Sequence, residues 1–440
     1  MSFKIAFIGA GSIGFTRGLF TDLMSIPAFH NIEVAFTDIN QHNLDMVTQL
    51  CQRDLDENGI DIQIQATLDR REAFKGAKYI FNCVRIGGLE AFEMDVNIPL
   101  KYGVDQCVGD TLCTGGIMYG QRVIAAMLDF CKDMREVADK DVLHLNYSNP
   151  NAMVTWACNI YGGIKTLGLC HGVIHGQEQI AEVLGLKYED IDVICAGLNH
   201  QTWYRKRPEE IKDWIDLGSW INGETGGYLR VCTEGRTWFE TDFPNWLKGP
   251  AKKYDGSDRG KEHGSYIIEA LETGKVYRGH FNVINNGCIT NLPEDCVVEV
   301  PCYVDGNGIM VPKVGDLPTG CAAICSQSVW VQRLAVEAAV SGNEELLKQA
   351  ALLDPLTGAI CNPPEVWQMI DEMIIAQEEW LPQYKEAIVK AKERWQEGNL
   401  ILTKENKGAA RLKTKTIEEM SLEKDKMRRI ASAAAKENVR

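Results

Sequence analysis

Residues 4–15 read Lys4-Ile5-Ala6-Phe7-Ile8-Gly9-Ala10-Gly11-Ser12-Ile13-Gly14-Phe15, and this stretch decides the fold. The apolar run that ends at Ile8 leads directly into glycines, which is typical of a buried parallel strand that enters a tight turn. Gly9, Gly11 and Gly14 have the G-x-G-x-x-G spacing. In such loops the first glycine permits the turn, the second lets a pyrophosphate approach the backbone, and the third lets the helix pack close to its strand. Ser12 and Ile13 then lie at a helix N-terminus, where free N–H groups face a phosphate.

A second strand-like run, residues 33–38, follows one helix length later and ends in Asp38. Dinucleotide-binding folds place at this position the carboxylate that binds the adenosine ribose hydroxyls. The alternative is a glycine-rich loop with Asp38 as an ordinary acid at a strand end. Strand, glycines and acid together favour the dinucleotide site. Because no arginine follows Asp38 directly, we expect NAD rather than NADP.

The order of strand-like and helix-like segments predicts two domains. Over residues 1–200 strands alternate with helices, which indicates an N-terminal Rossmann-type, doubly wound α/β sheet that binds NAD. Residues 275–303 look like antiparallel strands, and residues 328–395 are strongly helical. We therefore expect residues 201–440 to form an α+β domain for substrate binding and oligomerisation, with a helical C-terminal part. The charged segment after residue 404 is expected to be a solvated helix or a frayed tail.

Composition limits the class of protein. The formal net charge is −15 with a pI near 5.1, which disfavours a nucleic-acid or anionic-membrane partner. No run of eighteen apolar residues is present, and the N-terminus does not read as a signal peptide, so a cytoplasmic protein is expected. The fifteen cysteines contain no Cys-x-x-Cys pair. Most of them are therefore expected to be small buried apolar residues.

Polar residues follow three strand-like runs, which end in Asn149, Cys170 and His200. Because the ends of parallel strands lie at one edge of a sheet, these side chains are expected to converge. A thiolate and an imidazole could bind a divalent metal there and leave positions open for substrate. His171 and His175 are competing ligands. The alternative for any single cysteine or histidine is a core residue.

Two further side chains near this edge could act on a substrate. Asp110, in a polar loop before a long helix, could be a general acid if burial raises its pKa, or it could simply cap the helix. Asn149, which precedes Pro150, could contact substrate hydroxyls or hold a turn.

A set of ordered motifs extends these observations along the chain. They are Gly9-Ala10-Gly11-Ser12, Asp110-Thr111 with Gly115-Gly116-Ile117-Met118, Asn146-Tyr147-Ser148-Asn149-Pro150, Gly168-Leu169-Cys170-His171, Gly197-Leu198-Asn199-His200, and Asn286-Gly287 with Val298-Glu299-Val300-Pro301. With these motifs the chain, from Lys4 to about Tyr384, resembles the NAD- and metal-dependent glycosidases of glycoside hydrolase family 4. Residues 354–361 and 380–382 look especially like the α-galactosidase branch.

The resemblance implies roles for the candidate residues. Cys170 and His200 would bind Mn²⁺ or a similar divalent ion, Asn149 would contact the sugar, and Asp110 would protonate the departing oxygen. The family works by oxidation at carbon 3 with NAD, metal-assisted elimination, water addition and re-reduction, an exception to the two-carboxylate rule of glycosidases. His171 after the metal-binding cysteine is similar to members that act on unphosphorylated α-glycosides. Family members tend to form dimers or tetramers, so we expect a homodimer or homotetramer.

The base that removes the proton from carbon 2 is less well defined. The α-glycoside members often use a tyrosine that has no counterpart at the matching position, where Asp242 is a substitute and Tyr254 the other candidate. α-Galactosides are the expected substrates. α-Glucosides and α-uronides stay open, and Arg85 or Arg236 could face a uronic acid carboxylate. A plain NAD-dependent dehydrogenase of hydroxy acids or sugars is the alternative from another class.

Overall fold

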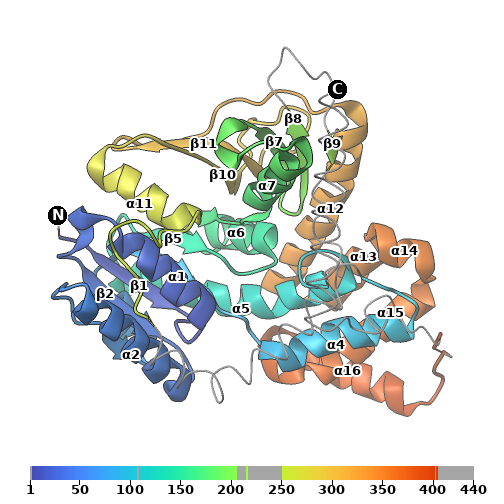
Figure 1. Ribbon diagram of the computed structural model, residues 1–440. Coiled ribbons are helices and arrows are strands. Elements are labelled where there is room, and N and C mark those ends of the chain that lie inside the picture. The colour runs from blue at the N-terminus through green and yellow to red at the C-terminus, as the bar shows by residue number, and fades with distance from the viewer. Residues whose placement is uncertain (1, 107–108, 206–214, 217–249, 402, 405–440) are drawn as a thin grey trace.

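The computed structural model describes residues 2–106, 109–205, 215–216, 250–401 and 403–404 (Figure 1). Its strands form one mixed sheet in the order β3-β2-β1-β4-β5-β6-β10-β11-β7-β8-β9, with β12 paired to β11. The strands are β1 Lys4–Ile8, β2 Glu33–Thr37, β3 Gln65–Thr67, β4 Ala77–Asn82, β5 Leu143–Asn146, β6 Thr166–Gly168, β7 Ile194–Leu198, β8 Gln201–Arg205, β9 Ile215–Asp216, β10 Tyr277–Ile284, β11 Val297–Asp305 and β12 Gly308–Met310.

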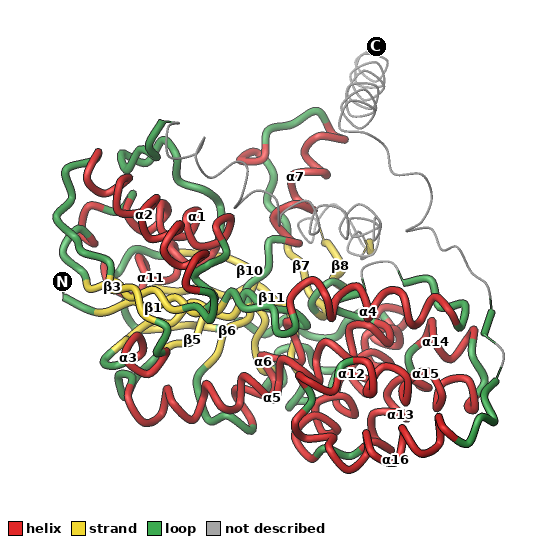
Figure 2. The backbone as a smooth tube through the Cα atoms, turned by 90° about the horizontal axis from the view of Figure 1, so that it is seen from below, coloured by secondary structure: helices red, strands yellow, loops and turns green. Residues whose placement is uncertain are grey.

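The first six strands are parallel, which confirms the predicted Rossmann-type sheet. The helices of this part are α1 Ile13–Met24, α2 Gln41–Glu57, α3 Arg70–Phe74, α4 Gly88–Lys101, α5 Cys113–Val137, α6 Asn151–Ile160 and α7 Gly172–Leu184. Figure 2 shows α1 and α2 on one side of the parallel strands and α3 and α5 on the other. Ile5 and Phe7 of β1 accordingly pack into one apolar cluster, whereas Ala6 and Ile8 pack into a second.

The first helix, α1, starts at Ile13 directly after the glycine loop and ends at Met24. Pro27 stands at the first position of a short 3-10 helix, Pro27–Phe29, because proline begins a helix more readily than it continues one.

The second part of the chain adds antiparallel strands and a helical layer, as predicted. β10 and β11 form a hairpin that lies between β6 and β7 in the sheet. The helices are α11 His263–Thr273, α12 Thr319–Ser341, α13 Glu344–Leu353, α14 Pro355–Ile360, α15 Pro363–Ala376 and α16 Lys385–Gln396. Figure 2 shows α12 to α16 gathered beside α4, and α12 packs against α5, α6 and α13.

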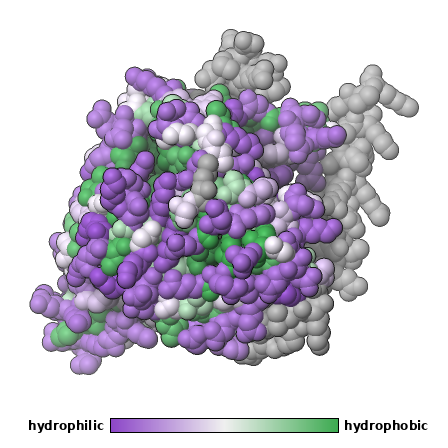
Figure 3. All heavy atoms as spheres, turned by 90° about the vertical axis from the view of Figure 1, so that its left-hand side faces the viewer, coloured by the Kyte–Doolittle hydropathy of each residue, from purple (hydrophilic) through white to green (hydrophobic). Residues whose placement is uncertain are grey.

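The polarity of the surface and the burial of the cysteines are those expected from the composition. The face in Figure 3 is mostly hydrophilic, with hydrophobic residues in separate patches. Within the described ranges no helix has the length and apolar character needed to cross a membrane. The described cysteines are free thiols, and all of them except Cys83 and Cys113 are buried, as expected for small apolar residues.

Candidate active site

The glycine loop closes tightly against the ends of two strands. The N–H groups of Gly9 and Ala10 donate to the carbonyl oxygen of Thr37 at 3.0 and 3.1 Å. Gly9 has a φ of +77°, and a Cβ added there would lie 2.8 Å from the backbone of Cys83 and Val84. The turn therefore requires glycine at this position, as predicted.

Asp38 stands beside the second glycine. Its carboxylate accepts hydrogen bonds from the Gly11 N–H at 2.8 Å and from the Asn40 N–H at 2.9 Å. A Cβ on Gly11 would lie 2.9 Å from Asp38 Oδ2, so the loop and the acid fit only with glycine there. Ile39, missed in the sequence analysis, is 99% exposed next to this acid and offers an apolar surface for a flat ring. These residues fit the adenosine half of a dinucleotide.

The remaining residues of the loop lie at the start of α1. Ser12 is the N-cap residue, and its side chain makes no capping hydrogen bond. Ile13 is the first helical residue and is half-buried. The packing role predicted for Gly14 is wrong, because a Cβ added at Gly14 would meet no atom within 4 Å. The helix start thus leaves backbone N–H groups without a side-chain cap, which suits a phosphate.

Asparagines and a serine tie together the carboxyl ends of β4, β5 and β6. Asn82 Nδ2 donates to Asn146 Oδ1 at 2.7 Å, and the Ser148 hydroxyl donates to the Val84 carbonyl at 2.7 Å. Asn151 Nδ2 donates to the carbonyl oxygens of Asn146 and Leu169 at 3.2 and 3.0 Å. The loops that carry the candidate site residues are therefore fixed to one another by buried hydrogen bonds.

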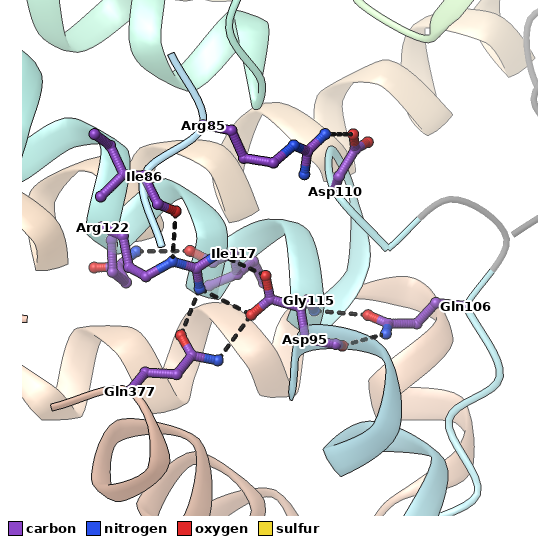
Figure 4. Close-up of polar contacts among 10 residues, drawn as sticks. Arg85, Ile86, Asp95, Gln106, Asp110, Gly115, Ile117, Arg122 and Gln377 are labelled. Carbon is purple, nitrogen blue, oxygen red and sulfur yellow. Dashed lines mark hydrogen bonds and ion pairs between the residues drawn. The ribbon is translucent and has the colours of Figure 1, made fainter. Parts of the chain in front are cut away.

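Asp110 lies at this edge of the sheet and is 1% exposed. Its Oδ2 atom is 3.4 Å from Arg85 Nη2 (Figure 4). The same atom is 3.3 Å from Asn149 Nδ2, and Asp110 Oδ1 accepts from the Thr111 hydroxyl at 2.8 Å. Arg85 in turn lies between two aromatic rings, with its Cζ 4.9 Å from the Phe92 centroid. The structure thus brings together Asp110 and Asn149, and joins Arg85 to them.

Cys170 and His200 meet, as the sequence predicted. Cys170 Sγ is 3.3 Å from His200 Nε2 and accepts the Gly172 N–H at 3.3 Å. Burial raises the pKa of the Cys170 thiol to about 11, so binding of a metal by the thiolate would release a proton. The other ring nitrogen of His200 is buried without a hydrogen-bond partner in the described part of the chain. A thiol and an imidazole nitrogen aimed at one point fit a divalent metal ion.

The two competing histidines contact a glutamate and each other. His171 Nδ1 is 3.5 Å from Glu262 Oε1, and this hydrogen bond raises the pKa of His171. The ring of His175 lies 4.6 Å from the ring of His171. Over the residues described, no group of three or more His, Cys, Asp or Glu side chains is arranged to hold a metal. Among the described residues, Cys170 and His200 are the candidate ligands whose sulfur and nitrogen atoms approach each other, at 3.3 Å.

The reason given for this convergence was wrong, although the pair itself was predicted. β7, which precedes His200, does not continue the parallel sheet: it pairs antiparallel with β11 and β8. Gly168, Asn282, Glu299 and Gly197 are paired in one row across β6, β10, β11 and β7. His200 lies in the turn between β7 and β8 with a φ of +60°. The inserted hairpin and this turn bring the imidazole to Cys170.

A buried acid behind the pair was missed by the sequence analysis. Glu299 is 1% exposed and accepts a hydrogen bond from Asn199 Nδ2 at 3.1 Å. Burial raises its pKa to about 7. One acid within the apolar run of residues 297–304 is the signal that could have marked it, because charged side chains are rarely buried without a role or a partner.

The candidate bases are not both described. Asp242 lies outside the described residues, as does Arg236. Tyr254 packs away from the metal pair: its ring centroid is 6.4 Å from that of Phe20 on α1, and its N–H donates to Asn58 at the end of α2. Burial raises the pKa of its hydroxyl strongly. This location does not favour Tyr254 as the base.

Taken together, the fold and the site define an enzyme of the dinucleotide-binding α/β class with a buried acid and a candidate metal pair at the carboxyl edge of its sheet. Comparison with known proteins identifies the family. Residues 4–186 match the model of family 4 glycosyl hydrolases, and residues 208–357 match the model of the family's C-terminal domain. The chain belongs to glycosyl hydrolase family 4.

Relatives with known names share most of the chain. It is 50% identical to an α-galactosidase of Rhizobium meliloti (strain 1021), over 96% of this chain and 98% of the relative. It is 32% identical to an α-galactosidase of Bacillus subtilis (strain 168), over 87% of this chain and 100% of the relative. A solved 6-phospho-β-glucosidase of Thermotoga maritima with manganese, NAD⁺ and glucose-6-phosphate is 23% identical, with a TM-score of 0.71 and coverage of 86% and 99%. The last comparison concerns the fold alone.

Proposed function

We propose that this enzyme hydrolyses unphosphorylated α-galactosides. The observation that carries the proposal is the approach of Cys170 Sγ and His200 Nε2 to 3.3 Å at the edge of a dinucleotide-binding sheet. A hydrolase of the usual kind needs two carboxyl groups that flank the bond, whereas a metal pair beside a nucleotide site suits redox-assisted elimination. The galactoside specificity is supported by the R. meliloti relative, which is an α-galactosidase.

The cofactors of the proposed reaction are NAD and a divalent metal, for which Mn²⁺ is the first candidate. Gly9, Gly11 and Asp38 would hold NAD, and Cys170 with His200 would hold the metal. When bound, NAD would supply oxidation and re-reduction at carbon 3, and the metal would act as a Lewis acid on the carbonyl so formed. The solved Thermotoga relative contains both manganese and NAD⁺.

The chain's own side chains would position the sugar and move protons. The Asp110 carboxyl group would donate a proton to the glycosidic oxygen. The Asn149 amide, whose Nδ2 is 3.3 Å from Asp110 Oδ2, would orient a sugar hydroxyl. Asp242 is proposed as the base that takes the proton from carbon 2. The engagement of His171 by Glu262 is in keeping with a sugar that carries no phosphate.

Other substrates and one other class are kept as alternatives. Arg85 lies at the same edge and could face the carboxylate of an α-uronide. An α-glucoside is neutral, like an α-galactoside, and would need no basic side chain for recognition. A dehydrogenase would use the same nucleotide loop. It would accumulate NADH in proportion to substrate consumed, and the glycosidase would not, because its hydride returns each turnover.

The test is cleavage of 4-nitrophenyl α-galactoside by dialysed enzyme under reductant, with NAD⁺ and Mn²⁺ added back singly and together. We expect activity only with both. Cys170→Ser should bind NAD normally and lose Mn²⁺-dependent activity, with metal binding followed directly by electron paramagnetic resonance of free Mn²⁺. Full hydrolysis without NAD and metal would refute the mechanism, and activity only on an α-glucoside or uronide would move the substrate.

A further inference from the structure

A fully buried ion pair lies behind the candidate acid. Arg122 on α5 is 1% exposed and Asp95 on α4 is 0% exposed. Arg122 Nη1 and Nη2 donate to the two oxygens of Asp95 at 2.9 and 2.7 Å, a bidentate geometry (Figure 4). Gln377, which follows α15, completes the group: its Nε2 donates to Asp95 Oδ1 at 2.9 Å, and its Oε1 accepts from Arg122. The ion pair is thus satisfied from three elements.

Two sets of hydrogen bonds, here called arms, extend from this group. The first arm, formed by Arg122, reaches the loop that carries Arg85. Arg122 Nε donates to the carbonyl oxygen of Ile86, the next residue, at 3.3 Å. Gly87 follows with a φ of +82°, and a Cβ added there would lie 3.1 Å from Arg122 Nε. The guanidinium therefore fixes the path of the chain directly after Arg85.

The other arm reaches the loop that carries Asp110. The backbone carbonyl oxygen of Asp95 accepts from Gln106 Nε2 at 2.8 Å, and Gln106 Oε1 accepts from the Gly115 N–H at 2.6 Å. A Cβ added at Gly115 would lie 2.7 Å from both the Asp95 and the Gly109 carbonyl oxygens. The chain is therefore fixed on both sides of Asp110, by the side chain of Gln106 before it and by the close fit of Gly115 after it.

We propose that Asp95 is the common anchor of Arg85 and Asp110, and that Arg122 and Gln106 are positioning residues for proton transfer by Asp110. Asp95 uses its carboxylate for one arm and its backbone carbonyl for the other, so a single residue sets the distance between the two functional side chains. A buried ion pair is weak evidence of a stabilising role, because apolar residues of similar volume often stabilise a fold as well or better. Precise placement of a proton donor, by contrast, changes rates by large factors. The inference rests on the proposed function, since it takes Asp110 as the general acid.

The test compares leaving groups. Methyl α-galactoside needs protonation of its departing oxygen far more than 4-nitrophenyl α-galactoside, because methoxide is much the poorer leaving group. Gln106→Met removes both hydrogen bonds of one arm at similar volume, and Arg122→Lys keeps the positive charge but removes the donor to Ile86. For each variant we expect kcat/KM to fall at least about tenfold further on the methyl glycoside than on the aryl glycoside.

Tyr384→Phe is the matched control. It removes a buried hydrogen bond of 2.7 Å to Gln121 in the same helical layer, and within the described part of the chain the Tyr384 hydroxyl makes no hydrogen bond to either loop. It should lower the melting temperature and leave the ratio of the two substrates unchanged. Equal loss on both glycosides in Gln106→Met and Arg122→Lys, or a change of ratio in Tyr384→Phe, would overturn the positioning role.

Failure of the proposed function would look different. If wild-type enzyme cleaved neither galactoside, or if Asp110→Asn did not change the substrate ratio, the assignment of substrate or acid would fall whatever the variants did. The anchor is then tested by a crystal structure of Gln106→Met, in which Arg85 and Asp110 should move apart beyond ion-pair distance. Unchanged positions of both side chains in that structure would refute the anchor independently of activity.

Discussion

Gly9 and Gly14 belong to the same sequence pattern but face different surroundings. Gly9 has a left-handed φ, and a Cβ there would meet the backbone of Cys83 and Val84, whereas Gly14 lies in the first turn of α1 with open space where a Cβ would be. We expect Gly9→Ala to destabilise the protein by at least about 1–2 kcal/mol from the backbone conformation alone, with the clash in addition. Gly14→Ala should leave the melting temperature unchanged or slightly higher, because alanine favours helices.

Thermal unfolding of both variants, together with NAD titration of Gly9→Ala by protein fluorescence, checks this contrast. Gly9→Ala should also bind NAD more weakly, because a shift of the loop moves the N–H groups that would face the phosphate. Equal melting temperatures for Gly9→Ala and wild type would contradict the reading of the turn.

Single residues also show where sequence reasoning succeeds. The ligand roles of Gly9, Asp38, Cys170 and His200 stay predictions. Cys170 and His200 meet as predicted, although the parallel strand order assumed for them is absent. The turn at Gly9 and the strand-end position of Asp38 could be predicted because each follows a local rule. Glu299 could not, because its importance comes from pairing in the sheet with residues more than a hundred positions away. The local pattern of an apolar strand hides an acid that only the assembled sheet buries.

The strands and helices could be predicted from the pattern of apolar residues within each segment, whereas the order of the strands in the sheet could not. The hairpin of β10 and β11 was expected, but its insertion between β6 and β7 was not. The sequence of an apolar strand does not specify which strand it pairs with. The same insertion explains why Cys170 and His200 meet although the assumed parallel order is absent. Pairing between distant strands is decided by the packed core, which the sequence of one segment does not contain.

The junction between β6 and the inserted hairpin depends on a residue without a side chain. A Cβ added at Gly168 would lie 1.9 Å from Asn151 Oδ1 and 2.4 Å from Thr155 Oγ1. Gly168→Ala should therefore displace Asn151, break its hydrogen bonds to Asn146 and Leu169, and cost about 3 kcal/mol of stability. Because Cys170 follows two residues later, binding of Mn²⁺ should weaken as well.

Denaturant unfolding and Mn²⁺ titration measure the two effects of Gly168→Ala. Gly320→Ala, at the start of α12 where a Cβ would meet nothing within 4 Å, is the control and should be neutral or stabilising. A wild-type unfolding midpoint and wild-type metal affinity in Gly168→Ala would show that the junction tolerates a side chain.

For the whole molecule, stability against pH is a balance of buried groups with opposite effects. Burial lowers the pKa of His144 and His263 to about 4 and that of His280 to about 3. The same cause raises the pKa of Asp22 to about 6 and that of Glu299 to about 7. The histidines stabilise the fold above the ordinary histidine pKa and lose this contribution as the pH falls. The two acids stabilise it at low pH and lose their contributions as the pH rises from the ordinary carboxyl pKa to about 6 for Asp22 and about 7 for Glu299.

His280 allows one of these contributions to be isolated. It lies on β10, and its Nε2 accepts the N–H of Cys195 at 3.1 Å, so the neutral ring is required in the fold. Between the ordinary histidine pKa and about 3 the unfolded chain binds one more proton at this residue, and the free energy of unfolding falls by about 1.4 kcal/mol per pH unit as the pH falls. In His280→Gln the amide oxygen can accept the same N–H without titrating. The variant should therefore lose stability on acidification less steeply than wild type by about that slope.

Denaturant unfolding of variant and wild type from pH 7.5 down to about 5 measures the difference between their stabilities. The contributions of the acids are the same in both proteins and cancel in this difference. His42→Gln, on the exposed face of α2, should keep the wild-type slope. Parallel profiles for His280→Gln and wild type would mean that the unfolded chain holds this histidine as neutral as the folded one does.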